Sequence, residues 1–396
     1  MQKRSGVTTV EYRMAGPADQ AAIQWLWDYC FERESDPFYQ WYFSQYYALD
    51  RVLGGYDGDQ MDCCLHLNPY TLELRGRAVP VSYIVGVATR PEARRGGAVR
   101  GLLQASLGEM RRREIAVSIL MPSAVGFYRP LHWEFCYHRL VYKLSPMDLK
   151  GFQGGPGRMR PATMDDFGRM QAIYRTFLAE KHGYVLRSFA NWQQLFEEHT
   201  LGGGRIYILE EGAAPIGYLF YALQGSTLVV REMAFVDGAA QTSLLQFLHN
   251  HRSQVEHIEW NAAIDDDVLF SLPNPKGQVL LEPMMTGRIV DVAAAFTGLP
   301  WSGSTAPIRL RVDDPLAPWN DQLFLLEEQD GCVTVTPCGE GTGDVRCSIG
   351  ALTQLLFGRL SVEELHRAGR CQGEAIAMAA LSTLLPPMIN YINEYY

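Results

Sequence analysis

A short motif that occurs twice constrains the fold of this chain more than any other feature. It comprises an arginine, an alanine two residues later and an aspartate six residues later, found at Arg13, Ala15 and Asp19 and again, 147 residues on, at Arg160, Ala162 and Asp166. In each copy a short strand reaches the arginine, and the aspartate stands where a helix would begin and could cap it. Two short matches can arise by chance, but their common register favours a duplicated domain.

A glycine-rich segment separates the two copies. Residues 151–157 contain four glycines and one proline, a composition that cannot hold a helix and is typical of a linker. A second, weaker break lies near residues 285–288. A chain of 396 residues is long enough for two to four domains. These breaks predict three domains, over residues 1–150, 151–287 and 288–396.

Composition excludes several classes of protein. Apolar residues make up 47% of the chain, which is ample for packed cores and excludes disorder as the dominant state. The net charge of −9 disfavours a surface that binds nucleic acid along its length. No stretch approaches 18 uninterrupted apolar residues, and no signal-peptide pattern opens the chain, so we expect a soluble, cytoplasmic protein. The spacing of cysteines and histidines indicates no metal site.

Hydrophobic periodicity predicts strands and helices in all three domains. The first should contain strands at 79–89 and 115–121 with a helix between them, whose apolar residues run from Val99 to Met110. The second should contain strands at 206–210, 216–223, 227–235 and 258–263, with a helix at 239–251. The third should start with residues 288–296 and contain strands at 308–312, 322–328 and 332–336, and helices at 348–357, 361–368 and 387–396. This mixture indicates an α/β (α+β) fold.

The loop between the strand at 79–89 and the following helix carries the chemistry. Arg94 and Gly97 form an Arg-x-x-Gly turn that leads into the first helical turn, where backbone N–H groups have no partner within the helix and the dipole is positive. Residues 90–113 hold seven arginines against two glutamates. This pattern is typical of a phosphate-binding cradle. A solvated helix face beside a glycine turn explains the loop equally well, and no Walker or dinucleotide-binding glycine motif is present.

The loop belongs to a wider pattern that resembles a known family. The stretch from Val87 through Ala88, Thr89 and Pro91 to Gly97, the helix from Leu102, and Phe127-Tyr128 followed by Trp133 resemble the acetyl-CoA-binding GNAT acetyltransferases. More narrowly, the chain resembles the enhanced intracellular survival (Eis) branch of that family. The resemblance implies tandem GNAT folds followed by a sterol-carrier-protein-like domain, which the segment from Leu355 to Ser361 and the aromatic C-terminus also resemble.

The resemblance also implies residue roles in the first domain. The backbone of Val87, Ala88 and Thr89 would face the acetyl group and pantetheine arm of acetyl-CoA. The pyrophosphate would be held by the loop and first helical turn, at Arg94, Arg95, Gly96, Gly97, Ala98, Val99 and Arg100. Ser123 and Ala124 would also contact CoA. The second domain has Gln241, Thr242 and Leu244 where the first has its arginines and glycine, so we expect a degenerate copy without a phosphate site.

Acetyl transfer to an amine requires a proton acceptor for the amine and a donor for the leaving thiolate. A phenol has a pKa near 10 and a thiol near 8.5, so a positioned tyrosine is a plausible acid, and the resemblance assigns this role to Tyr128. It assigns the base to the α-carboxylate of Tyr396, delivered into the first domain's site by the third domain. Two alternative interpretations remain open. Tyr128 could be one of many tyrosines that fill a core, and the aromatic C-terminal tail could pack against the protein without taking part in catalysis.

The sequence says less about the amine that accepts the acetyl group than about the cofactor. Net negative charge favours a cationic amine, and the resemblance implies aminoglycosides, polyamines or lysine, together with a hexameric assembly. Asp28, Glu32, Glu34, Asp36 and Glu394 could line an amine pocket, although most of them are expected to be ordinary surface charges. The aromatic residues from Trp25 to Phe43 could shape a wide cavity or fill a core.

Two other functions fit the same sequence. The chain could be a non-catalytic module that binds CoA or a lipid on a GNAT and sterol-carrier scaffold, but the arginine-rich loop argues against this. It could also be a structural hexamer that senses CoA without turnover. Binding of acetyl-CoA and release of CoA with a panel of amines discriminate among the three.

Overall fold

The chain forms two compact units in the computed structural model, which describes residues 10–276, 278–301 and 306–395. The first unit joins Met1–Glu134 to Met285–Pro387, and the second joins Phe135–Met284 to Met388–Tyr395. Strand β12 (Val279–Ile289) begins in the second unit and ends in the first. No helix of the described residues is long and apolar enough to span a bilayer.

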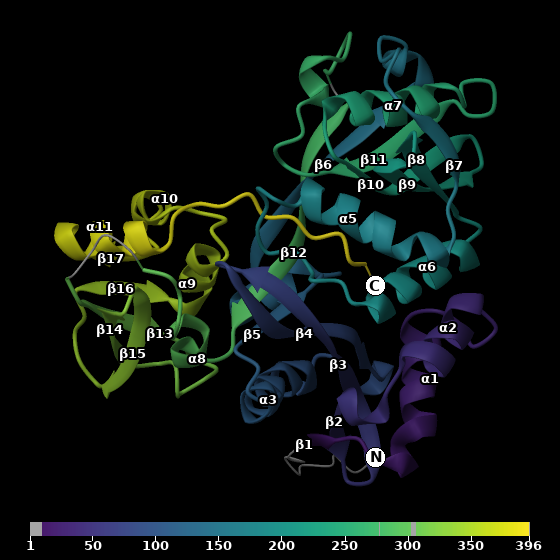
Figure 1. The fold of residues 1–396 in the computed structure, drawn as a ribbon. Coiled ribbons are helices and arrows are strands. Elements are labelled where there is room, and N and C mark those ends of the chain that lie inside the picture. Colours follow the sequence, from purple (N-terminus) through teal and green to yellow (C-terminus); the bar gives the residue numbers. More distant parts are fainter. Residues whose placement is uncertain (1–9, 277, 302–305, 396) are drawn as a thin grey trace. The chain divides into compact units, whose positions relative to one another are not determined.

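A mixed sheet forms the centre of the first unit (Figure 1). Its order is β1-β2-β3-β4-β5-β12, with β1 (Glu11–Met14), β2 (Val52–Asp57), β3 (Gln60–Leu74), β4 (Arg77–Thr89) and β5 (Val117–Leu120). Neighbouring strands are antiparallel except for the parallel pair β4 and β5. A crossover helix, α3 (Ala98–Arg112), connects that pair as parallel strands require.

Helices cover both faces of this sheet. Ile23 and Leu26 of α1 (Gln20–Cys30) pack with Val52 and Cys64 on one face. The apolar stripe of α3 includes Leu102 and packs on the other face. The remaining helices of this region are the short α2 (Pro37–Trp41) and α4 (Val125–Tyr128). The helix and the two strands predicted around the arginine-rich loop are therefore confirmed, with ends that differ by a few residues.

The repeated motif forms the same ion pair in both copies. Arg13 of β1 lies 2.9 Å from Asp19, and Arg160 lies 2.6 Å from Asp166. The prediction that these aspartates cap the helix through its own N–H groups is wrong, because neither makes a side-chain bond to the helix. Asp19 instead accepts from the N–H of Gly16, in the turn before the helix. The motif clamps the first strand to the turn that follows it.

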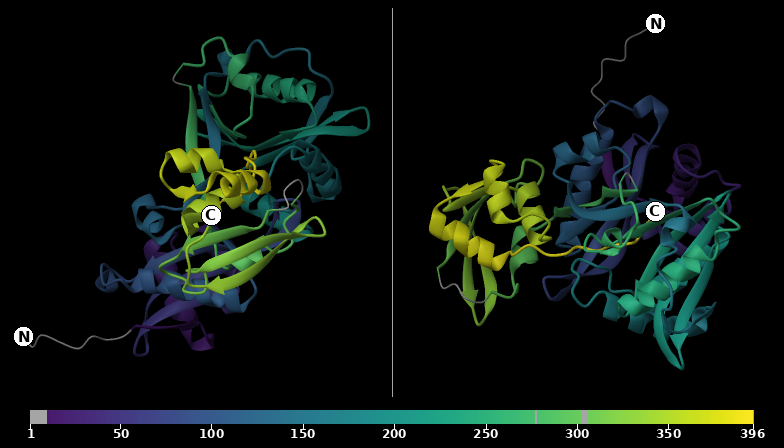
Figure 2. Two further views of the ribbon diagram at one scale, coloured as in Figure 1. Left: turned by 90° about the vertical axis from the view of Figure 1, so that its left-hand side faces the viewer. Right: turned by 90° about the horizontal axis from the view of Figure 1, so that it is seen from above.

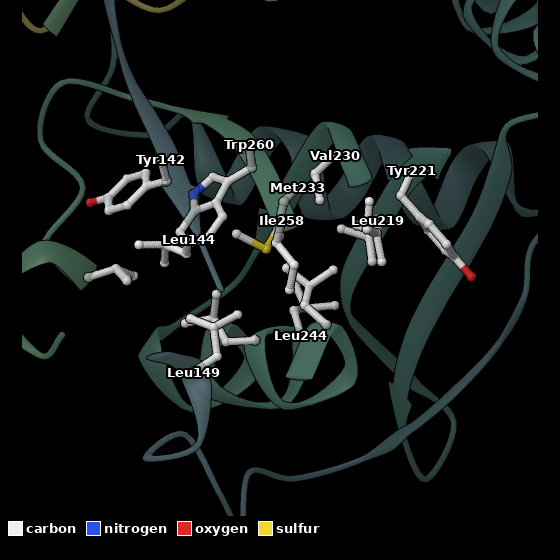
Figure 3. Close-up of a cluster of buried hydrophobic side chains, with 14 of the residues drawn as sticks. Tyr142, Leu144, Leu149, Leu219, Tyr221, Val230, Met233, Leu244, Ile258 and Trp260 are labelled. Carbon is white, nitrogen blue, oxygen red and sulfur yellow. The ribbon is translucent and has the colours of Figure 1, made fainter. Parts of the chain in front are cut away.

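The second unit repeats this layered arrangement. Its sheet has the order β12-β6-β11-β10-β9-β8-β7. The strands are β6 (Glu134–Leu144), β7 (Arg158–Pro161), β8 (Arg205–Glu211), β9 (Ala214–Gln224), β10 (Thr227–Phe235) and β11 (His257–Ala262). The helices are α5 (Phe167–Phe177), α6 (Phe189–Leu201) and α7 (Gly238–His249). Leu244 of α7 packs with Leu219, Ile258 and Trp260 in the core drawn in Figure 3.

A small antiparallel and parallel sheet with helices forms the C-terminal part of the first unit (Figure 2). Its order is β15-β14-β13-β16-β17, with β13 (Ile308–Asp313), β14 (Leu323–Gln329), β15 (Cys332–Gly339), β16 (Val345–Ser348) and β17 (Cys371–Gly373). The helices are α8 (Val292–Phe296), α9 (Ile349–Leu356), α10 (Val362–Arg367) and α11 (Ala375–Leu384). This confirms the prediction of a small sheet covered by helices.

Residues 288–296, with which the third domain is predicted to start, contain the end of β12 at Ile289 and the whole of α8, whose N-terminus is capped by Asp291 through a hydrogen bond from Ala294 N–H. One predicted element of this region is wrong. The helix predicted over residues 387–396 is not formed by the described residues 387–395. Those residues are extended, because their backbone and side-chain groups bond to residues of other segments of the second unit, such as Cys136, His182 and Arg231.

Candidate functional site

A cavity opens in the first unit where β4 and β5 separate. Their parallel pairing ends at Ile84 and Leu120, and beyond this point a space of about 250 Å³ lies between the strands. Its walls come from α1 and the turn after it, α2, β4, the end of β5 with the loop that follows, and α4. The lining residues are Trp27, Phe31, Glu32, Phe38, Tyr83, Ile84, Val85, Gly86, Val87, Leu120, Met121, Pro122, Ser123 and Tyr128.

Gly86 creates the irregularity in β4 that leaves this space. The register between β3 and β4 shifts between Cys64 and His66, and Gly86 has a φ of +60° in the left-handed region. A Cβ at this position would lie 2.6 Å from the indole of Trp27. Sequence reasoning missed this residue, although a glycine inside a predicted strand is a known signal for a bulge.

Tyr128 lies in the wall of the cavity at the end of α4. The residue is 7% exposed, and burial raises the pKa of its phenol to about 12. Its hydroxyl is therefore protonated throughout the neutral range and can act as a proton donor. Val87 and Ser123 line the same cavity, so the structure brings together these three residues of the predicted site.

The arginine-rich loop follows β4 directly. Gly97 precedes α3 with a φ of +83°, and Arg95 also has a positive φ of +68°. The guanidinium of Arg94 donates from Nε to the carbonyl of Thr89 at 3.3 Å and lies 5.6 Å from the ring of Tyr29. The loop therefore places the open N-terminus of α3 next to the end of the strand that lines the cavity.

The other predicted loop residues divide between surface and core. Arg95, Gly96 and Arg100 are exposed, as an anion site requires. Ala98 and Ala88 are buried and pack in the two cores beside the sheet, and Val99 is half-buried. Their side chains are thus structural, and only their backbone groups are available to a ligand. Ala124 is exposed at the start of α4.

One carboxylate stands among the aromatic walls. Glu32 lines the cavity and accepts a hydrogen bond of 2.9 Å from Trp27 Nε1. The neighbouring acids have structural roles, since Asp28 pairs with Arg33 at 3.2 Å and Asp36 caps α2. Of the acids proposed for an amine pocket, Glu32 lines this cavity, whereas Glu394 is buried against Arg187 in the second unit.

A buried histidine supports the aromatic wall from behind. Trp27 stacks on Tyr42 with ring centroids 4.3 Å apart, and the Tyr42 hydroxyl is hydrogen-bonded to His66 Nδ1 at 2.7 Å. Burial lowers the pKa of His66 to about 3, so the ring is neutral. The predicted aromatic run thus both lines the cavity, through Phe31 and Phe38, and fills a core, through Tyr42.

The second unit has different chemistry at its corresponding helix. Asp237 caps α7, Gln241 donates to Asp266, and Thr242 bonds to the carbonyl of Gly238. Leu244 is buried in the core. These contacts hold the helix in place and supply no cationic group for a phosphate. Tyr396, the predicted base, lies outside the described residues.

Comparison with known families identifies three domains. Residues 11–136 and residues 183–289 each match an Acetyltransferase (GNAT) domain family, and residues 292–393 match the Sterol carrier protein domain family. A search of curated proteins gave no match.

Several crystal structures share this fold along the chain. A probable N-acyltransferase from Enterococcus faecalis aligns over 98% of this chain and 100% of its own, with 22% identity and a TM-score of 0.87. A GCN5-related N-acetyltransferase from Anabaena variabilis aligns over the same shares, with 22% identity and a TM-score of 0.85. Eis1 from Mycobacterium abscessus also covers 98% and 100%, with 19% identity and a TM-score of 0.73.

Proposed function

This chain belongs to the GNAT acetyltransferases, with two GNAT domains and a sterol-carrier-like domain, and we propose that its first unit transfers the acetyl group of acetyl-CoA to a primary amine of a cationic substrate. The observation that carries the proposal is the cavity at the separation of β4 and β5, which holds Tyr128 and Glu32 and adjoins the arginine-rich loop. We assign catalysis to residues 1–150, a scaffold role to 151–287 and delivery of the C-terminus to 288–396.

Acetyl-CoA fits the groups present along β4 and α3. The backbone of Val87, Ala88 and Thr89 faces the thioester and pantetheine arm in this proposal. The N–H groups at the start of α3, with Arg94, Arg95 and Arg100, hold the pyrophosphate, because a helix N-terminus and guanidinium groups both favour anions. Gly96, Gly97, Ala98 and Val99 contribute backbone there, and Ser123 and Ala124 contact CoA from the other side. Backbone donors at the irregularity in β4 polarise the thioester carbonyl.

The nitrogen of the substrate loses two protons and the sulfur of CoA gains one. A base removes the first proton from the substrate ammonium, and the free amine attacks the thioester carbon to form a zwitterionic tetrahedral intermediate. Collapse of that intermediate breaks the carbon–sulfur bond and releases the CoA thiolate. Tyr128, whose buried phenol is protonated at neutral pH, donates its proton to the thiolate and regains one from the positively charged nitrogen, which leaves the amide and the CoA thiol.

We assign the base to the α-carboxylate of Tyr396. A chain-terminal carboxylate has an ordinary pKa of about 3.3–3.7, and burial of any carboxyl group in apolar surroundings raises its pKa and makes it a better proton acceptor. The preceding residues support this assignment, since Tyr391, Ile392 and Glu394 are all nearly buried and the segment is held by many hydrogen bonds. A loose tail could not present a carboxylate in one position.

Glu32 supports a cationic acceptor. Its carboxylate lies among the aromatic rings of Trp27, Phe31 and Phe38, and ammonium groups are attracted both by a carboxylate and by aromatic faces. Aminoglycosides, polyamines and lysine side chains all present such a group. We further propose a cytoplasmic homohexamer, whose size light scattering after gel filtration would measure.

Release of CoA with a panel of aminoglycosides, polyamines and lysine peptides tests the proposed function. We expect turnover with at least one class, and we expect three residues added after Tyr396 to reduce kcat strongly without changing acetyl-CoA affinity. The same addition at the N-terminus is the control. Binding of acetyl-CoA without turnover on any amine would overturn the proposal and favour a CoA-binding module.

A further inference from the structure

The segment over residues 388–395 is held by the second unit as an extended strap (Figure 1). The N–H of His182 donates to the carbonyl of Ile389, and the N–H of Tyr391 donates to the carbonyl of His182, both at 2.9 Å. Asn390 bonds His182 Nδ1 at 2.7 Å and donates to the carbonyl of Cys136 at 2.9 Å. These bonds fix the first half of the strap in one register.

The second half of the strap is held by side chains. Asn393 donates from Nδ2 to the carbonyl of Arg231 at 3.0 Å. The hydroxyl of Tyr395 accepts from Arg139 Nη1 and from Asn261 Nδ2, each at 2.7 Å. Polar residues of the strap therefore have matched partners on the strands of the second unit.

One buried guanidinium connects the strap to the core. Arg187 donates through Nη1 and Nη2 to both oxygens of Glu232, at 2.7 and 2.6 Å, and through Nε to Glu394 at 2.8 Å. The Arg187 side chain is 2% exposed and that of Glu232 is fully buried. The rings of Tyr174 and Trp192 lie 4.3 and 4.9 Å from the guanidinium carbon. A charge enclosed in this way has few alternative positions, so its third bond fixes Glu394.

In the second unit, the strap contacts the position of the sheet that is equivalent to the position of the cavity in the first unit. The parallel pairing of β10 and β11 ends at Val230 and Trp260, as that of β4 and β5 ends at Ile84 and Leu120. Asn393 bonds the carbonyl of Arg231, the first residue of β10 beyond that pairing.

The two units also have different residues at the following position of the strand. Two residues beyond the pairing, β4 has Gly86, which lines the cavity of the first unit, whereas β10 has Glu232, which is buried and accepts a hydrogen bond of 2.8 Å from Asn393. The cavity of about 290 Å³ beside β10 is walled in part by Tyr391 of the strap. The strap thus contacts β10 just beyond the end of its pairing with β11, the position that the cavity has relative to β4 and β5 in the first unit.

Charge at this end of the second unit opposes a phosphate ligand. Asp237 caps the N-terminus of α7, and Asp265, Asp266 and Asp267 line the adjacent cavity together with one lysine, Lys181. Carboxylates at this position repel an anionic cofactor. The first unit has arginines at the corresponding loop.

We propose that the second unit has exchanged cofactor binding for anchoring the strap, and that Arg187 is a positioning residue for catalysis in the first unit. It acts through Glu394, two residues before the proposed base. The inference rests on the proposed function, since a fixed strap affects turnover only where the carboxylate of Tyr396 is the base.

Glu394→Ala is the sharpest test because it releases the strap and leaves the buried pair of Arg187 and Glu232 intact. Arg187→Met would leave Glu232 buried without its partner and could unfold the unit. Arg160→Gln is the matched control, since Arg160 also bonds two carboxylates, Asp166 and Glu210, but does not contact the strap. Hydrogen exchange of residues 388–396 in the full chain is measured alongside kcat and KM.

We expect Glu394→Ala to accelerate exchange across the strap and to lower kcat by about tenfold or more, as loss of a charge-assisted hydrogen bond implies. The KM for acetyl-CoA should stay within about twofold, and Arg160→Gln should change neither exchange in the strap nor kcat. If hydrogen exchange in the strap of Glu394→Ala is unchanged, the proposal that Glu394 anchors the strap is overturned. If exchange is faster but kcat is unchanged, the proposal that Arg187 positions the base is overturned. Absence of turnover in the unmodified chain would contradict the proposed function, while exchange would still decide the anchoring.

Discussion

Trp27 Nε1 donates a hydrogen bond of 2.9 Å to Glu32 Oε2, and both side chains line the cavity at the end of β4. The bond occupies one carboxylate oxygen and orients the group between aromatic rings. It links the buried aromatic core of the first unit to the one acidic side chain among the cavity walls.

Glu32→Gln should therefore weaken binding of the amine acceptor without weakening binding of acetyl-CoA. Loss of the charge should raise the KM of the amine by about ten- to a hundredfold, the range for a hydrogen bond to a charged group, with the KM of acetyl-CoA nearly unchanged. Steady-state kinetics with each substrate varied in turn checks this. Asp28→Asn, which alters an acid outside the cavity, is the control, and an unchanged amine KM in Glu32→Gln would show that another group binds the ammonium.

Tyr128→Phe should lower kcat by about a hundredfold or more, the usual contribution of a positioned acid. The ring remains, so calorimetry should give the same affinity for acetyl-CoA. Phe127→Leu, a change at the adjacent half-exposed ring, controls for disturbance of α4. A kcat near that of the unmodified enzyme would assign the proton donor to another residue.

Gly86→Ala should abolish most activity and destabilise the first unit by about 1–3 kcal/mol. The new Cβ would stand 2.6 Å from Trp27 at a φ of +60°. Thermal melting and the CoA-release assay measure the two effects. Gly108→Ala in α3, where a Cβ meets open space, should instead be neutral or stabilising, and equal behaviour of the two variants would contradict the role given to Gly86.

His66 should make the first unit sensitive to acid. Burial lowers its pKa from 6.5 to about 3 in the folded chain, so the unfolded chain binds more protons between these values. This difference in proton binding does not reduce the free energy of unfolding above about pH 6.5. As the pH falls below that value, the free energy of unfolding decreases, by about 2 kcal/mol at pH 5. Urea unfolding at about pH 7 and pH 5 measures the loss. His66→Gln should reduce it, and an equal loss in that variant would assign the sensitivity to other groups.

Sequence reasoning predicted the elements whose signals are local. The helix from Ala98 and the strand ending at Thr89 follow from apolar periodicity and from a loop of arginines and glycines. The family resemblance then gave the order of the domains.

The features that were missed depend on residues far apart in the chain. Glu394 bonds Arg187 across 207 positions, so nothing near residue 394 indicates that the tail is extended. Glu32 and Asp28 have similar neighbours in the sequence, and only the turn after α1 directs one of them into the cavity. Trp27 shows in the same way that one aromatic side chain can both line a site and fill a core.

The first unit is assembled from two separate stretches of chain, and this has a consequence for biosynthesis. Val290, Leu316 and Ala317 complete the same buried cluster as Leu102 of α3. On the ribosome, the amino-terminal stretch emerges first, yet its core stays incomplete until Phe135–Met284 of the second unit and the residues up to Ala317 have been translated. At about 5–20 residues per second, the nascent chain therefore lacks these three apolar side chains of the cluster around α3 for many seconds after the helix itself has been made.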